Sequence, residues 1–128
     1  MATLSAYGVA IEPGTESVSL SAAQTGNGDS TNTAFRGQRT DGGGVVVTST
    51  VGATPTVTVN IQGSVDGTNW FNVPYALSAT PRTFVVSAIT ITTAATSTYL
   101  LQELVFYQYL KLAYSANTNV TLTATAYL

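Results

Sequence analysis

Histidine and cysteine are both absent from this chain of 128 residues. Without histidine the chain lacks the usual general base near neutral pH and the commonest metal ligand, and without cysteine it has neither disulfides nor thiolate chemistry. Beyond residue 44 the only carboxylates are Asp66 and Glu103, and nothing in their spacing brings them together as the catalytic pair of a glycosidase. We therefore expect a protein that is not an enzyme and that holds no cofactor or metal ion.

Charge is also scarce, since charged residues make up 8% of the chain against about 25% in an ordinary globular domain. Binding to nucleic acid needs a cluster of basic side chains, and the four present here form none in the sequence: Arg36, Arg39, Arg82 and Lys111. A hydrophobic chain with so few charges has a poorly solvated surface. We expect much of that surface to contact another protein, the alternative being an unusually neutral monomer.

Long apolar segments are missing as well. No uninterrupted apolar run approaches the ~20 residues needed to span a bilayer, and the first residues lack both the basic region and the apolar stretch of a secretion signal. We expect no membrane contact and synthesis in the cytoplasm. What the chain does contain is threonine in abundance, and a β-branched residue of this kind favours strands over helices.

The stretch from Thr56 to Val73 has the clearest pattern. Apolar residues or glycine alternate with polar residues from Val57 to Val65, which predicts a strand with one buried face and one solvated face. Asp66 and Gly67 suit the positive φ of a tight reversal, and an apolar run resumes at Trp70. We expect a hairpin in which these three residues are structural and in which Trp70 is mostly buried.

Other segments extend this β pattern over the chain. We expect strands at 18–22, 45–51, 84–92, 106–114 and 120–128, turns at 52–55 and 115–119, a loop at 93–98, a strand or irregular segment at 99–105, and at best an edge strand between Pro74 and Pro81. Seven or eight short strands at roughly ten-residue spacing are typical of an all-β fold. We predict an antiparallel β-sandwich, jelly-roll-like in its connections.

Residues 1–44 differ in composition from residues 45–128, because they carry most of the glycines. Between Ala23 and Gly44 the only large apolar side chain is Phe35, so burial offsets little of the entropy lost on ordering. We expect an extended N-terminal arm or long glycine-rich loop that belongs to the same domain as the β-sandwich core at 45–128. In the arm, Phe35, Arg36 and Arg39 are candidate partner contacts.

Three tyrosines are the other candidate contacts. Tyr107 and Tyr109 lie on one predicted strand and Tyr127 on its expected partner, so they could line up as an exposed aromatic face that binds a protein or a sugar. The alternative is that the N-terminal arm covers them. Partner contact and self-contact stay equally open on these residues alone.

Three runs of sequence resemble a known family. These runs, Val59-Asn-Ile-Gln-Gly-Ser-Val-Asp-Gly-Thr-Asn-Trp70, Tyr109-Leu-Lys-Leu-Ala-Tyr114 and Asn119-Val-Thr-Leu-Thr-Ala124, are similar to those of small β-sandwich capsid decoration (cement) proteins of tailed bacteriophages. The resemblance implies a virion protein that forms a homotrimer on the outer capsid surface and stabilises the shell by binding the major capsid protein. A phage tail, baseplate or fibre component, or a carbohydrate-binding module that uses Trp70 or the tyrosines, remains an alternative.

Overall fold

The computed structural model describes residues 17–31, 33–34, 43–101 and 108–127. Within these ranges the chain forms nine strands and no helix, and every strand pair is antiparallel. The all-β, antiparallel prediction is therefore confirmed, while the jelly-roll-like connectivity stays a prediction. The strands are β1 (Ser17–Gln24), β2 (Gly28–Asp29), β3 (Thr33–Ala34), β4 (Gly43–Ser64), β5 (Trp70–Asn72), β6 (Tyr75–Leu77), β7 (Ile89–Ile91), β8 (Ala95–Leu101) and β9 (Tyr109–Tyr127).

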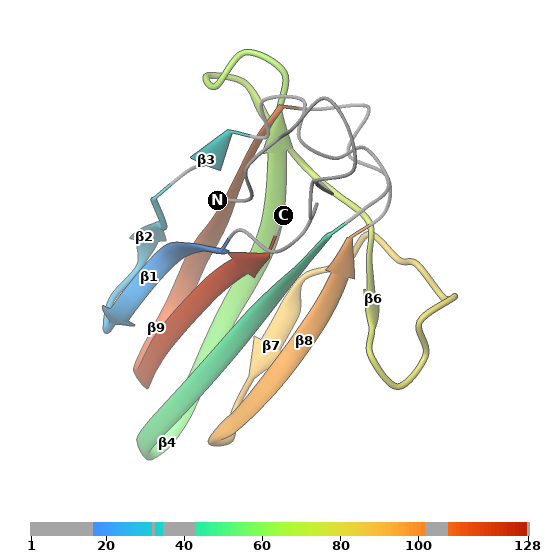
Figure 1. The fold of residues 1–128 in the computed structure, drawn as a ribbon. Helices are drawn as coiled ribbons and strands as arrows, with labels where there is room; N and C mark the ends of the chain where they lie inside the picture. Colours follow the sequence, from blue (N-terminus) through green and yellow to red (C-terminus); the bar gives the residue numbers. More distant parts are fainter. Residues whose placement is uncertain (1–16, 32, 35–42, 102–107, 128) are drawn as a thin grey trace.

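Two long strands, β4 and β9, pair with each other and organise the sheet. Near their middles both strands bend sharply, so that the sheet folds over and its two halves face each other (Figure 1). The first half of β4 pairs with the second half of β9, as in Val45↔Ala126, and the second half of β4 pairs with the first half of β9, as in Ile61↔Leu112. The two layers of the fold are thus one sheet folded over, and two strands run through both.

The expected turns at 52–55 and 115–119 do not end strands, which corrects the prediction of separate short strands. Register shifts fall between Val51 and Thr56 and between Thr56 and Thr58 on β4, opposite β9. Extra residues in one strand of a pair bend it without ending the pairing. Segments with turn-like composition therefore became bulges inside two continuous strands.

The core lies between the two halves of the folded sheet. Alternate residues of β4 and β9 point inward, as the period of a strand requires, and they form one hydrophobic cluster with Leu20 of β1 and Leu101 of β8. The cluster includes Val45, Val47, Val57, Val59, Ile61, Leu110, Leu112, Tyr114, Val120, Leu122, Ala124 and Ala126. Each fully buried aliphatic side chain of this kind contributes about 1.5–3 kcal/mol of hydrophobic free energy.

Shorter strands complete both layers. In the layer formed by the first half of β4, the order is β1-β9-β4-β8-β6. In the other layer β2 and β3 pair with β9, while β5 and β7 pair with the opposite side of β4. β6 ends its layer, so the segment between Pro74 and Pro81 is an edge strand as expected.

Two local expectations need correction. The segment 93–98, expected to be a loop, contributes most of β8, whose residues Ala95–Leu101 pair with the start of β4. The expected strand at 84–92 is shorter, because only Ile89–Ile91 forms β7 and Val85 makes an isolated bridge to Tyr75. The small polar residues at 95–98 form a strand because the start of β4 pairs with them. The more apolar residues at 84–88 form no strand because, among the described residues, only Val85 pairs with another segment.

Part of the predicted N-terminal arm belongs to the sheet. β1, β2 and β3 follow β9 around its bend, pairing in turn with Tyr127–Leu122, Tyr114–Ala113 and Leu110–Tyr109. Leu20 is 2% exposed and lies in the core. The strand expected at 18–22 is present, and the polar stretch after it is held along β9 at least as far as Ala34, with residue 32 outside the described residues.

Candidate interaction surfaces

The β4–β5 hairpin ends in a turn that Asp66 organises. Its Oδ1 accepts hydrogen bonds from the backbone N–H groups of Thr68 and Asn69, both at 2.8 Å, and its Oδ2 accepts one from Asn69 Nδ2 at 2.7 Å. Gly67 has a φ of 78°, which a residue with a side chain rarely adopts. The hairpin is present, with Ser64 opposite Trp70 across the turn, and these contacts fit the structural roles expected of Asp66 and Gly67.

The hydrogen bonds to Asp66 should make the turn sensitive to acid. The backbone N–H of Asn69 and then that of Thr68 hold the pKa of the Asp66 carboxyl well below its ordinary value of 3.8. A lowered folded-state pKa contributes stability above the unfolded-state pKa, and this stability is lost as pH falls. We expect Asp66→Asn to lower Tm at pH 7, because it removes the carboxylate charge and places an amide beside Asn69 Nδ2. The difference in Tm between this variant and the unmodified protein should become smaller between pH 4 and pH 2, where the stabilising carboxylate becomes protonated.

Thermal unfolding followed by circular dichroism from pH 7 to pH 2 measures this gap. Thr68→Val is the matched control, because Thr68 uses only its backbone N–H in the turn. A gap between Asp66→Asn and the unmodified protein that stays constant over the whole pH range would contradict the role of the carboxylate charge.

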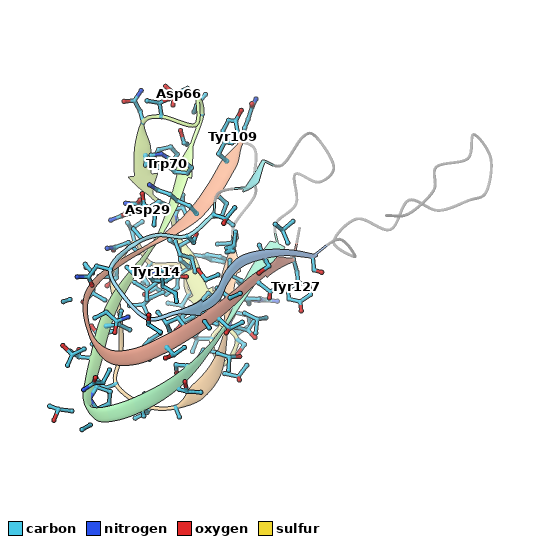
Figure 2. The ribbon with its side chains drawn as sticks, turned by 90° about the vertical axis from the view of Figure 1, so that its left-hand side faces the viewer. Asp29, Asp66, Trp70, Tyr109, Tyr114 and Tyr127 are labelled. Atoms are coloured by element: carbon cyan, nitrogen blue, oxygen red, sulfur yellow. The ribbon has the colours of Figure 1, made fainter. Side chains whose placement is uncertain are left out.

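Trp70 lies on the outer face of the second layer and is mostly buried, as expected, although it covers Lys111 and is not part of the core cluster. The ammonium group of Lys111 stands 4.5 Å from the centroid of its ring and donates a hydrogen bond of 2.6 Å to Asp29 Oδ2. Lys111 is only 8% exposed, because Trp70 on β5 and Asp29 on β2 reach over it from the two sides of the β4–β9 pair (Figure 2). A cation–π contact of this kind occupies the ring face that a sugar would stack on.

The predicted contact residues are only partly visible. Phe35, Arg36, Arg39 and Tyr107 lie outside the described residues. Of the others, Tyr109 is half-buried, and its ring lies over the hairpin turn, 3.6 Å from the position that a Cβ on Gly67 would take.

Tyr127 lies at the other end of β9, where it is 44% exposed and pairs with Ser17 and Gly44. Figure 2 shows Tyr109 and Tyr127 far apart on the molecule. The expected alignment of these two tyrosines on facing strands is therefore wrong. The reason is that residues 109–127 form one bent strand, so the two side chains are at its opposite ends.

A different surface was missed in the sequence. Large apolar side chains are exposed along the segment from Val65 to Val86, which supplies β5 beside β4 in one layer and β6 at the end of the other. They are Val65 (61% exposed), Phe71 (42%), Leu77 (48%), Val85 (45%) and Val86 (59%). We name this segment the apolar edge. In the sequence, the adjacent valines Val85 and Val86 are the signal for this surface, but they fall within the strand predicted at 84–92.

The comparisons with known proteins bear on the fold. The structure is similar to the crystal structure of the SPBc2 prophage-derived protein YomS, with a TM-score of 0.58 and 9% sequence identity over 87% of this chain and 90% of that one. No protein-family model matches the chain, and no curated protein matches it in sequence. At this identity the likeness shows a shared fold. The folded β arrangement therefore occurs in a prophage-derived protein of similar extent.

Two further features concern the part of the chain that the structure describes. No group of three or more acidic residues there is placed to hold a metal ion. No helix in that part is long and apolar enough to cross a membrane. The candidate surfaces described above are the apolar edge, the two tyrosines and the outer faces of the sheet.

Proposed function

We propose that the chain is a structural virion protein that decorates a phage head. It binds the outer surface of the capsid and stabilises the shell, as a cement protein does. The observation that carries the proposal is the fold shared with a prophage-derived protein over 87% of the chain. It agrees with the resemblance of the Val59–Trp70 run and the two C-terminal runs to capsid decoration proteins.

The surface chemistry supports a protein partner. Exposed large apolar side chains on short edge strands are available for contact with another protein, and the apolar edge has five exposed large apolar residues between Val65 and Val86. Its strands are short, with three residues each in β5 and β6. Short edge strands offer little template for uncontrolled strand pairing, so we assign the contact to side chains.

We propose the major capsid protein as the partner of the apolar edge and a homotrimer as the assembled form. A cement protein bound between neighbouring capsid subunits covers apolar surface that is exposed in the isolated chain. Sedimentation of the purified protein would give the oligomer mass, and a purely monomeric species at all concentrations would exclude the trimer as a free state.

A charge placed in the apolar edge should weaken binding to the shell. We expect Val86→Asp to bind purified shells that lack this protein at least tenfold more weakly, because an unpaired carboxylate at an apolar interface loses its hydration. Val86 is 59% exposed, so the isolated variant should keep its Tm. Co-sedimentation with shells over a range of protein concentrations measures the binding.

Val51→Asp is the matched control, since Val51 is also an exposed valine (38%) but lies at the bend of β4, outside the apolar edge. Equal binding by both variants and the unmodified protein would remove the apolar edge from the contact. Copy number per particle tests the location: hundreds of copies support decoration of the head, and a handful would instead favour a tail, baseplate or fibre component.

A further inference from the structure

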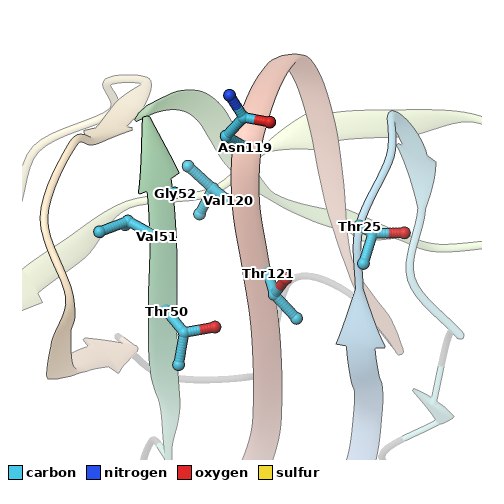
Figure 3. A pocket seen from close by; sticks show the side chains of 7 residues that line it. All are labelled: Thr25, Thr50, Val51, Gly52, Asn119, Val120 and Thr121. Atoms are coloured by element: carbon cyan, nitrogen blue, oxygen red, sulfur yellow. The ribbon is translucent and has the colours of Figure 1, made fainter. Parts of the chain in front are cut away.

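A polar hollow lies on the outer face of the sheet, beside the bend of β4 and β9. It has a volume of about 380 Å³ and is open to solvent (Figure 3). Thr50 on β4 and Thr121 on β9 are direct partners in the strand register, and Thr25, just after β1, lies on the far side of β9 from Thr50. The hollow therefore spans three adjacent chain segments that lie far apart in the sequence.

The lining is uncharged. Its polar side chains are those of Thr25, Thr50, Thr121 and Asn119, and Val51, Gly52 and Val120 complete the lining. Within the described part of the chain, no hydrogen bond engages the hydroxyls of Thr25, Thr50 or Thr121. A hydroxyl both donates and accepts, so the surface matches a ligand whose own groups do the same.

The bend holds this lining in place. Asn119 has a φ of 55°, and its Nδ2 donates to the Ala53 carbonyl at 2.6 Å, which ties β9 to the bulge of β4. A Cβ at Gly52 would meet Asn119 Cβ at 3.3 Å, so the two strands are already in close contact there. A site built on paired strands binds with less loss of conformational entropy than one on a free loop.

The hydroxyl surface continues beyond the hollow. Thr48 and Thr123 are the next pair of register partners on the same face of β4 and β9. Thr48 Oγ1 lies 3.1 Å from Thr96 Oγ1 of β8. Among the described residues, neither the lining of the hollow nor the Thr48–Thr123 pair includes a charged side chain or an aromatic ring. Protein interfaces depend on aromatic and arginine anchors, so a second protein is a poor match for this surface.

We propose that the hollow binds a neutral oligosaccharide. Sugar hydroxyls would exchange hydrogen bonds with the hydroxyls of Thr50, Thr121 and Thr25. The volume is within the range of about 300–1,000 Å³ typical of small-ligand sites. This site is separate from Trp70 and from the apolar edge, so it can function while the apolar edge is bound to a shell.

The test is a titration of the full chain with neutral oligosaccharides of four to six sugar units: glucans, galactans and mannans. Amide chemical shifts of residues 50–52 and 119–121 in ¹⁵N-labelled protein report binding at the hollow. We expect shifts at millimolar concentrations with at least one neutral sugar, and smaller shifts with an oligogalacturonate, whose carboxylates find no cation in the lining. The double variant Thr50→Val/Thr121→Val should bind about tenfold more weakly, since it loses two hydrogen-bonding hydroxyls and keeps β-branched side chains.

Thr90→Val, on β7 and exposed, is the control and should bind like the unmodified protein. Two outcomes would overturn the proposal: no neutral sugar shifts the amides of the hollow, or the double variant retains full affinity while its spectrum shows an intact fold. Neither outcome bears on shell binding, which Val86→Asp tests separately.

Discussion

Replacing Tyr114 by alanine is expected to lower the free energy of unfolding by about 3–5 kcal/mol, the range for truncating a large buried aromatic residue. Tyr114 is 3% exposed and points into the core from the first half of β9. Its hydroxyl lies 2.7 Å from Ser21 Oγ in a buried hydrogen bond. Ser21 is on β1, which pairs with the second half of β9, so this bond joins the two halves of the folded sheet.

Tyr114→Phe separates the ring from the hydroxyl. It should lower the free energy of unfolding by about 1–2 kcal/mol, because the ring is kept but the Ser21 hydroxyl loses its hydrogen-bond partner. Chemical denaturation of both variants measures the two costs. If Tyr114→Phe were as stable as the unmodified protein, the hydrogen bond between the layers would have no net effect.

The tyrosine also predicts a response to alkaline pH. Burial raises the pKa of Tyr114 above its ordinary value of 10.0, although the hydrogen bond with Ser21 acts the other way. A raised folded-state pKa gives stability that is complete below pH 10 and is lost as pH rises beyond it. Tyr114→Phe should therefore lose less stability above pH 10 than the unmodified protein. Burial also raises the pKa of Tyr99, so both proteins should still lose the stability that depends on Tyr99.

Replacing Asn117 by alanine should destabilise the bend of β9 by about 2–3 kcal/mol, because two backbone groups lose their partner at about 1–1.5 kcal/mol each. The Asn117 side chain makes two hydrogen bonds to the backbone of Val120: Nδ2 donates to its carbonyl at 3.0 Å and Oδ1 accepts from its N–H at 3.1 Å. Val120 is 1% exposed, so water would replace these partners poorly.

Asn27→Ala is the matched control for Asn117→Ala. Asn27 Oδ1 accepts one exposed hydrogen bond of 2.8 Å from the backbone N–H of Asn117, and its loss should cost less than about 1 kcal/mol. Urea denaturation with a common m-value compares the two variants. An Asn117→Ala variant as stable as Asn27→Ala would show that the bend does not depend on the Asn117 side chain.

The bend is also where backbone strain is concentrated. Thr54, Ala116 and Asn119 have φ values of 48°, 52° and 55°, a region that L side chains seldom occupy. All three lie where β4 and β9 pass from one layer to the other. The surrounding hydrogen bonds, including those of Asn117, hold these conformations in place.

The inward faces of the strands could be predicted because they depend on a local period. Val57, Val59 and Ile61 are buried as their alternation indicated, and so are Leu110 and Leu112. The hairpin at Asp66-Gly67 followed from the chemistry of two adjacent residues. In each case the information lies within a short stretch of chain, because neighbouring side chains in a strand point to opposite faces whatever the partner strand is.

The candidate surfaces depended on contacts between distant residues. Lys111 is covered because Asp29 and Trp70, both far before it in the sequence, lie on either side of it. Val85 forms only an isolated bridge to Tyr75, and Val86 lies between that bridge and β7, where no strand of the described residues pairs with it, so both valines are exposed. No local pattern distinguishes an apolar residue at the margin of a sheet from one in its middle, since the difference is whether a further strand is present.

The all-β class, the inward faces of the two long strands and the position of one tight hairpin follow from residue chemistry at short range and could be read from the sequence. The sequence could not show that the segments 52–55 and 115–119 bend two continuous strands and do not separate four short ones, because this depends on long-range pairing. A turn-like segment ends a strand if its flanks find different partners and bends it if they keep the same one. Here β4 and β9 pair with each other on both sides of the bend, so the two turn-like segments bend the strands and do not end them.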